Sequence, residues 1–188
     1  MILAIVSKTN GAKDTVAKYL FQNYGIPMVV SYTTRPMRGY ETDGIQHYFV
    51  DDERMEKILK TEDIIAYTKN EETGIQYCAT VQALTNEDIV YIINPDGIRW
   101  FKENGTNKIE MKSIYIYSKE EDILRRGRER GDDVEVLEKR LSSERAEFDE
   151  FYENKGYDYL VRNISSLDYL YGQVDAVMEI LGFEKVSR

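Results

Sequence analysis

Three segments of the sequence carry residues that suit the binding of phosphate groups. The first is SKTNGAKDT at positions 7–15, between an apolar run and an amphipathic stretch. A phosphate-binding loop has the pattern G-x-x-x-x-G-K-[ST] in this context, where backbone N–H groups and the lysine meet a polyphosphate. Ser7 and Ala12 replace the two glycines, so the pattern alone leaves an ordinary strand-to-helix loop equally open. Asn10 and Gly11 still supply positions that tolerate a positive φ.

The second segment, residues 31–44, places Arg35 and Arg38 three positions apart behind three hydroxyl residues. Two guanidinium groups at this spacing form a fork that suits one phosphate. Because Arg35 precedes a proline, the segment is expected to be a loop, which follows a strand predicted at residues 28–30. The alternative is a solvated turn in which the arginines pair with Glu41 and Asp43.

The third segment, residues 125–131, holds four arginines within six positions. Residues four apart share a face of a helix, so Arg126 and Arg130 could meet the same anion. A charge run of this kind is also typical of a solvated helix face, and that interpretation stays open.

The elements that must position these segments follow an alternating strand and helix pattern. Continuous apolar runs predict buried parallel strands, and one-sided apolar stripes predict helices. We expect strands at residues 1–6, 28–30, 89–93, 113–117 and 159–161, helices at 13–24, 98–104 and 166–181, and a turn at 94–97. The sequence therefore predicts an α/β fold around a parallel sheet.

Two stretches depart from this pattern. Residues 31–84 predict short strands at 48–50, 64–68 and 76–79 and a helix at 52–60, which together form a small α+β insertion. Residues 119–150 contain 20 charged residues among 32, so they are expected to form exposed helices. Ser118 with Glu121 has the pattern of a capping box that opens the first of these helices.

The charge of the chain limits its partners. Its 188 residues include 34 acidic and 25 basic ones, for a formal net charge of −9. Such a field repels nucleic acid and anionic membranes, so a polyanion needs a local basic cluster. The sequence shows neither a long apolar run nor the basic start of a signal peptide, and we expect a cytoplasmic protein.

The order of the three segments resembles that of the guanylate kinase family. The pattern Ser-x-Thr-Thr-Arg-x-x-Arg-x-x-Glu-x-x-Gly begins at Ser31 and follows the lysine of the first segment. The resemblance continues through residues 74–77 (GIQY), 92–97 (IINPDG), 123–131, 140–147 and 157–163. It therefore covers nearly the whole chain.

The resemblance implies one domain over residues 1–188 with a P-loop three-layer fold. Its core would be residues 1–30 and 85–188, with an insertion at 31–84 that binds a nucleoside monophosphate and a helical lid at about 118–145. It implies a kinase that transfers the γ-phosphoryl group of ATP, with Mg²⁺, to (d)GMP or another (deoxy)nucleoside monophosphate. We expect a monomer or homodimer that binds neither nucleic acid nor membrane.

The resemblance also assigns roles by position. ATP would be bound by Asn10, Gly11, Ala12, Lys13, Asp14, Thr15 and Asn163. The monophosphate would be bound by Ser31, Arg35, Arg38, His47, Thr68, Tyr77 and Asn94. The transferring phosphoryl group would be stabilised by Lys13, Arg126, Arg130 and Arg140.

Three of these positions depart from the family pattern. His47 stands where the family has a tyrosine, although a lone histidine on a strand is more typical of a packed residue. Thr68, or Ala66 if the following turn is longer, stands where the family has a guanine-reading glutamate. Asn94 replaces an aspartate. We therefore expect phosphate binding to be kept and base recognition to be altered.

Asp14 allows two interpretations. Its carboxylate could neutralise Lys13, which would give a catalytically silent binding module. Alternatively it could ligate Mg²⁺, which prefers oxygen ligands, and the loop resembles those of active phage-type deoxynucleoside monophosphate kinases. A kinase with a non-guanine or modified-nucleotide acceptor is a further alternative.

Overall fold

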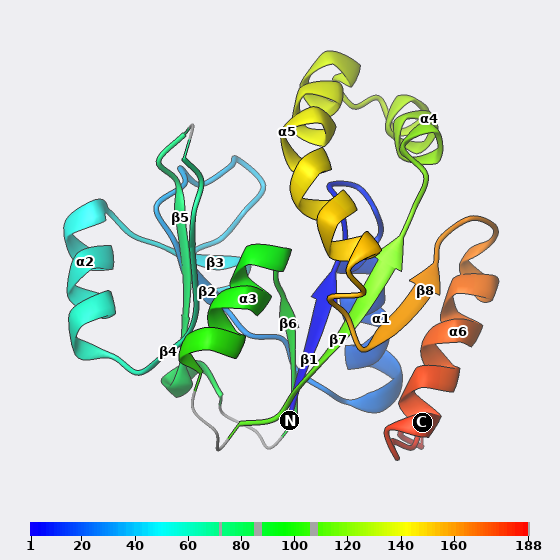
Figure 1. Ribbon diagram of the computed structural model, residues 1–188, viewed down its shortest axis with the longest axis horizontal. Helices are drawn as coiled ribbons and strands as arrows, with labels where there is room; N and C mark the ends of the chain where they lie inside the picture. Colours follow the sequence, from blue (N-terminus) through cyan, green and yellow to red (C-terminus); the bar gives the residue numbers. More distant parts are fainter. Residues whose placement is uncertain (72, 85–87, 106–108, 188) are drawn as a thin grey trace.

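The computed structural model describes residues 1–71, 73–84, 88–105 and 109–187. Its central sheet has four parallel strands in the order β6-β1-β7-β8, as Figure 1 shows. The strands are β1 (Ile2–Val6), β6 (Ile89–Ile92), β7 (Met111–Tyr117) and β8 (Tyr159–Arg162). All five residues of β1 are buried, because helices cover both faces of the sheet. The predicted parallel α/β core is confirmed.

The helices form two layers around this sheet. Helices α1 (Lys13–Tyr24) and α6 (Leu167–Ile180) pack on the face that carries Leu3 and Ile5. Helix α3 (Pro95–Asn104) and the last turns of α5 (Val134–Glu153) pack on the opposite face, against Ile2 and Ala4. The alternation of side chains along β1 thus supplies one core cluster on each face.

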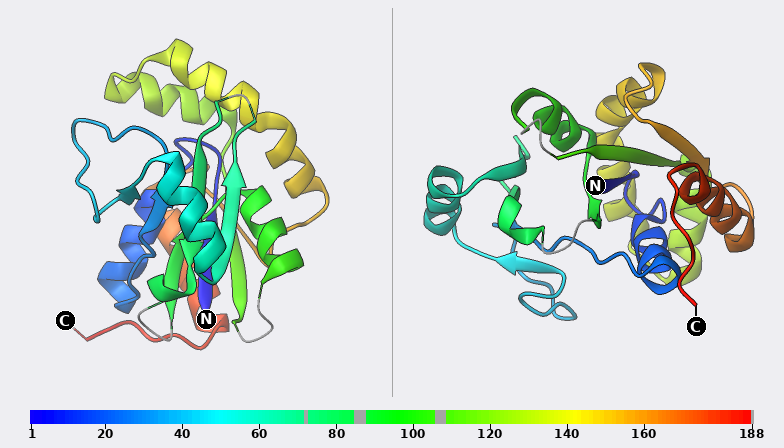
Figure 2. Two further views of the ribbon diagram at one scale, coloured as in Figure 1. Left: turned by 90° about the vertical axis from the view of Figure 1, so that its left-hand side faces the viewer. Right: turned by 90° about the horizontal axis from the view of Figure 1, so that it is seen from below.

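A second, mixed sheet has the strand order β3-β2-β5-β4. Its elements are β2 (Ser31–Thr33), β3 (His47–Phe49), α2 (Asp52–Thr61), β4 (Ile64–Lys69), β5 (Gln76–Thr80) and the 3₁₀ turn η1 (Val81–Ala83). Helix α2 covers one face, and the other face joins the core cluster around α3. Figure 2 shows this sheet beside the central one. These elements lie within the expected insertion, whose boundary at residue 85 falls outside the described residues.

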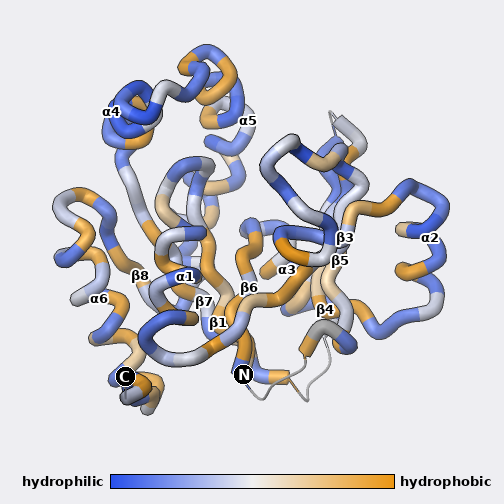
Figure 3. Tube along the Cα trace, turned by 180° about the vertical axis from the view of Figure 1, so that it is seen from behind, coloured by the Kyte–Doolittle hydropathy of each residue, from blue (hydrophilic) through white to orange (hydrophobic). Residues whose placement is uncertain are grey.

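Helix α4 (Glu120–Arg130) and the first turns of α5 stand above the ends of the central strands (Figure 1). They share a small apolar cluster of Ile123, Leu137 and Leu141, and most of the residues of α4 are hydrophilic (Figure 3). Phe148 and Phe151, near the end of α5, are buried in the central core. The helix pair is thereby anchored to the core through α5.

Two predicted elements near the second phosphate segment are wrong. Residues 28–30 form no strand, and only Met28 makes an isolated parallel bridge to Val90. Residues 31–33, predicted as the start of a loop, instead form β2 at the centre of the second sheet. Residues 28–30 are apolar, whereas residues 31–33 are the polar Ser-Tyr-Thr, so local composition favoured the wrong stretch. The strands that pair with residues 31–33 are distant in sequence.

Two predicted helix starts are also wrong. Residues 94–97 are not a turn, because Asn94 caps α3 and Pro95 is its first residue, where proline is favoured. The predicted capping box at Ser118 is not formed, because α4 begins at Glu120 with Lys119 as its N-cap. The Ser118 hydroxyl instead donates to the carbonyl of Gly11 over 3.4 Å. No helix of the described residues is long and apolar enough to cross a membrane.

Candidate functional site

The loop between β1 and α1 has the strained backbone of an anion-binding loop. Asn10 and Ala12 have φ values of 54° and 86°, a region that costs an alanine about 1–2 kcal/mol. Gly11, expected to share this conformation, does not, but a Cβ there would lie 1.8 Å from the Ser7 hydroxyl oxygen. Lys13 is the first residue of α1, so the loop leads directly into a helix N-terminus.

Carboxylates from α4, α5 and the turn between them contact this loop. The Lys8 ammonium lies 2.9 Å from Glu120 and 3.1 Å from Asp149. The Asn10 amide donates to Asp132 over 3.0 Å. These contacts hold the loop against the helix pair.

Glu144 contacts the backbone of the β1–α1 loop directly. Its carboxylate accepts from the N–H of Thr9 over 2.7 Å, within the loop itself. Burial raises the pKa of Glu144, against the opposing effects of this bond and of Lys13. A carboxylate therefore takes one of the N–H donors that an anion-binding loop presents to phosphate.

Glu147 makes a matching contact one helical turn further along α5. It accepts from the N–H of Asp96, in the first turn of α3, over 3.0 Å. Burial raises the pKa of Glu147 to about 7. Helix α5 thus contacts the loops that follow β1 and β6, which are neighbouring parallel strands. Ligands of α/β proteins bind at this carboxyl edge.

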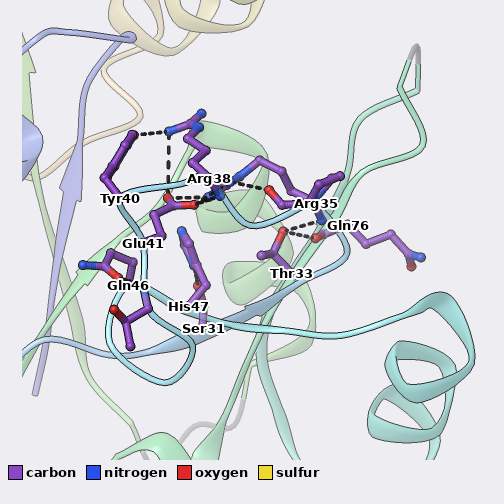
Figure 4. A network of polar contacts seen from close by, with 11 residues as sticks. Ser31, Thr33, Arg35, Arg38, Tyr40, Glu41, Gln46, His47 and Gln76 are labelled. Atoms are coloured by element: carbon purple, nitrogen blue, oxygen red, sulfur yellow. Dashed lines mark hydrogen bonds and ion pairs between the residues drawn. The ribbon is translucent and has the colours of Figure 1, made fainter.

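A second cationic cluster lies in the loop between β2 and β3 (Figure 4). Arg35 makes a bidentate contact with Glu41, at 2.8 and 2.9 Å, and its guanidinium lies 5.3 Å from the ring centre of Phe49. This arginine lowers the pKa of Glu41 to about 2. Arg38 is half-exposed and lies 4.0 Å from the same carboxylate. The expected pairing with Glu41 is thus present, and two cations share one carboxylate.

Four further predicted residues lie beside this cluster. Ser31 and His47 pair across the parallel strands β2 and β3, with 3.0 Å between the hydroxyl oxygen and Nδ1. Tyr77 on β5 has its ring centre 5.8 Å from that of His47. Thr68 is the register partner of Tyr77. The structure therefore gathers the residues predicted to bind the monophosphate on the second sheet and its β2–β3 loop, except Asn94.

Asn94 and Asn163 lie at the carboxyl edge of the central sheet. Asn94 Oδ1 accepts from the N–H of Gly97 over 3.0 Å, so this oxygen caps α3. Asn163 follows β8, is 5% exposed, and its backbone N–H donates to Tyr117. Ala66, the alternative to Thr68, is 1% exposed and packs in the core, which leaves Thr68 as the accessible position.

The three predicted lid arginines differ in their surroundings. Arg126 Nη2 is buried and has no hydrogen-bond partner among the described residues, and burial lowers its pKa. Arg130, one turn later on α4, pairs with Asp132. Arg140 is exposed on α5. The described contacts do not bring Arg126 and Arg130 onto one group of the protein.

No sequence pattern indicated the carboxylates that contact the loop. Thr9 and Glu144 are separated by 135 positions, and both sit in segments that resemble solvated surface. The charge-rich stretch around Glu144 indicated only exposed helices. Among the described residues, no group of three or more His, Cys, Asp or Glu residues is arranged to hold a metal ion. Asp14 is a single exposed carboxylate on the first turn of α1.

Comparison with known proteins gives a consistent result. The sequence model of a family described as guanylate kinase matches residues 1–181. The guanylate kinase of Alkalilimnicola ehrlichii is 31% identical over 170 residues, which is 86% of this chain and 80% of that protein. That of Bradyrhizobium diazoefficiens is 28% identical over 185 residues, 95% of this chain and 82% of its own length. The crystal structure of guanylate kinase from Anaplasma phagocytophilum matches with a TM-score of 0.66 at 24% identity, covering 97% of this chain and 84% of that one.

The raised pKa of Glu147 predicts a pH-dependent stability. Because folding favours its protonated form, its contribution is fully present below the ordinary pKa of about 4.5 and is lost as the pH rises through about 7. Glu147→Gln keeps an acceptor for the Asp96 N–H without the charge. We expect it to unfold like the wild type at pH 4 and to be more stable by about 1–3 kcal/mol at pH 8.

Denaturant unfolding of both proteins at the two pH values measures this difference. Glu153→Gln, an exposed change of the same kind on α5, is the matched control and should follow the wild type throughout. Equal stability of Glu147→Gln and wild type at pH 8 would contradict the assignment.

Proposed function

Because the chain belongs to the guanylate kinase family and is an ATP-dependent nucleoside monophosphate kinase, we propose that it transfers the γ-phosphoryl group of ATP to GMP or dGMP. The observation that carries the proposal is the β1–α1 loop, which keeps a left-handed backbone at Ala12 where only glycine would be unstrained. Such strain persists where function requires the conformation. We further propose a cytoplasmic enzyme that acts as a monomer or homodimer.

In this proposal the two cationic sites bind the two substrates. The N–H groups of residues 9–15 and the Lys13 ammonium hold the β- and γ-phosphates of ATP at the N-terminus of α1, and Asn163 lies near the adenine. The acceptor's phosphate binds at Ser31, Arg35, Arg38, His47 and Tyr77. Residues 31–84 form the acceptor-binding part, and residues 118–145 form the lid.

Phosphoryl transfer then depends on position and charge. Lys13 and the lid arginines Arg126, Arg130 and Arg140 offset the negative charge that spreads over the transferred group. The buried Nη2 of Arg126, which has no hydrogen-bond partner in the described part of the chain, supports this role, because a desolvated guanidinium without an acceptor is costly. Movement of the lid over the substrates would exclude water and favour transfer over hydrolysis.

Mg²⁺ fits this site as a companion of ATP. A magnesium ion that arrives with a triphosphate takes most of its ligands from phosphates and water, so one carboxylate suffices. Asp14 is exposed immediately after Lys13 and would hold it, with Thr15 next to it. The bound ion would offset phosphate charge and orient the triphosphate.

Base recognition is the part of the site that differs most from the family. A carboxylate at position 94 would accept from guanine N1 and N2, whereas Asn94 already uses its oxygen to cap α3 and offers an amide donor. Thr68 offers one hydroxyl. We therefore propose guanine as the preferred base, with weaker rejection of other bases than a carboxylate pair provides.

The proposed activity predicts a selective loss in Lys13→Met. Removing a cation that contacts the transferred group should lower kcat/KM by roughly 100-fold to 1,000-fold. ADP release from ATP and Mg²⁺ with a panel of ribo- and deoxynucleoside monophosphates measures this, with GMP and dGMP expected to be the best acceptors. Lys18→Met, an exposed lysine of α1, is the control and should retain wild-type rates.

Two outcomes would contradict the proposal. One is normal turnover by Lys13→Met. The other is the absence of ADP release with every acceptor together with no binding of ATP, which would favour a catalytically silent binding module.

The Thr9–Glu144 contact predicts that Glu144 competes with ATP. The phosphates of ATP need the same N–H group, so the carboxylate must leave or take up a proton when ATP binds. Glu144→Gln removes the like charge and should lower the KM for ATP by about threefold to tenfold, which corresponds to a repulsion of about 1 kcal/mol. Initial rates at varied ATP concentration measure the effect.

Glu138→Gln removes a charge from the exposed side of the same helix and should leave the KM for ATP unchanged. A KM for ATP that stays the same or rises in Glu144→Gln would show that the carboxylate does not oppose the phosphates.

A further inference from the structure

His47 is the only histidine of the sequence, and its ring lies within the second cationic cluster. It belongs to β3, where it pairs with Ser31 of β2. Its Nδ1 lies 3.0 Å from the Ser31 hydroxyl oxygen, and its ring packs edge-on against Phe49 and Tyr77. No described residue forms a hydrogen bond with Nε2. One ring nitrogen is thus fixed by the sheet and the other is available to a ligand.

The charged groups around this ring leave an excess of positive charge. From the loop between β2 and β3 come Arg35, Arg38 and Glu41 (Figure 4), and β5 contributes the ring of Tyr77. Glu41 is engaged by Arg35 through both carboxylate oxygens and by the backbone N–H of Arg38. The carboxylate of Glu41 therefore faces two guanidinium groups. Their net positive charge disfavours protonation of the imidazole ring.

The unliganded protein accordingly keeps His47 neutral. Burial is the largest cause that lowers the pKa of His47 below its usual value of 6.5, and the positive charge of Arg35 lowers it further. Arg38 also lowers the pKa of His47. Glu41 raises this pKa, but its effect is smaller than that of burial. A phosphate group bound by these arginines would reverse the balance, because a monoester dianion brings about two negative charges to the ring.

We propose that His47 takes up a proton from solvent when the acceptor's phosphate binds, and that the resulting imidazolium donates a hydrogen bond to a phosphate oxygen. This inference rests on the proposed function, since it requires that the acceptor's phosphate meets Arg35 and Arg38. It makes His47 a phosphate-binding residue whose charge depends on the ligand. A tyrosine in this position would donate a hydrogen bond without a change of charge.

The consequence is an acceptor affinity that depends on pH. Where His47 is neutral in the free protein and protonated in the complex, binding needs a proton, so affinity falls as pH rises. We expect the KM for GMP to rise about threefold to tenfold between pH 7 and 8.5. The second ionisation of the phosphate, near pH 6, is complete in this window and contributes little.

Two substitutions separate a titrating role from a structural one. His47→Gln removes the titration and should give a KM for GMP that is high and independent of pH between 7 and 8.5. His47→Tyr should restore tight binding and remain independent of pH, because the phenol stays protonated in this window. A KM for ATP that is unchanged in both variants confines the effect to the acceptor.

Nuclear magnetic resonance of the untagged chain tests the proposal directly, because a single histidine gives a single Cε1–Hε1 resonance. We expect saturating GMP to raise the pKa measured from this resonance by about two units, and guanosine, which lacks the phosphate, to leave it unchanged. A pKa that stays constant or falls in the saturated GMP complex would overturn the proposal and leave the kinase assignment intact. Failure of GMP to bind at any pH would instead contradict the proposed function.

Discussion

The arrangement of this site depends on one electrostatic constraint: groups suited to bind phosphate must be balanced by the protein's own carboxylates when no phosphate is bound. Arg35 is held by Glu41 through two hydrogen bonds. The loop after β1 gives its Thr9 N–H to Glu144. In a chain with a net charge of −9, such carboxylates are abundant, and their placement decides which phosphate-binding groups remain free.

This balance connects the helix pair above the sheet to the two places where substrates are proposed to bind. Glu144 and Glu147 lie one turn apart on α5 and contact the loops after β1 and β6. The pKa of each carboxyl is raised by burial, so neither ion is strongly stabilised where it lies. The end of α5 is fixed in the core by Phe148 and Phe151. A change at the loop after β1 can therefore reach the paired helices α4 and α5 through α5.

The sequence predicted those parts of the fold that local patterns determine. Helix α1 and the buried strand β1 follow from apolar periodicity, and the bounds of α1 agree with the prediction. The strand at residues 28–30 and the turn at 94–97 were wrong, because strand partners and the choice between a turn and a helix cap depend on distant residues. For the same reason Glu144 could not be predicted: its role comes from a contact across 135 positions.

The central claim is that the nucleotide replaces the protein's own carboxylate at the phosphate-binding loop. A crystal structure with Mg²⁺, GMP and a non-hydrolysable ATP analogue tests it most directly. The separation of the Thr9 nitrogen and Glu144 Oε2, 2.7 Å in the unliganded protein, should then exceed hydrogen-bonding distance, with a phosphate oxygen bonded to the Thr9 N–H. A triphosphate bound elsewhere while Glu144 remains on that N–H would contradict the account.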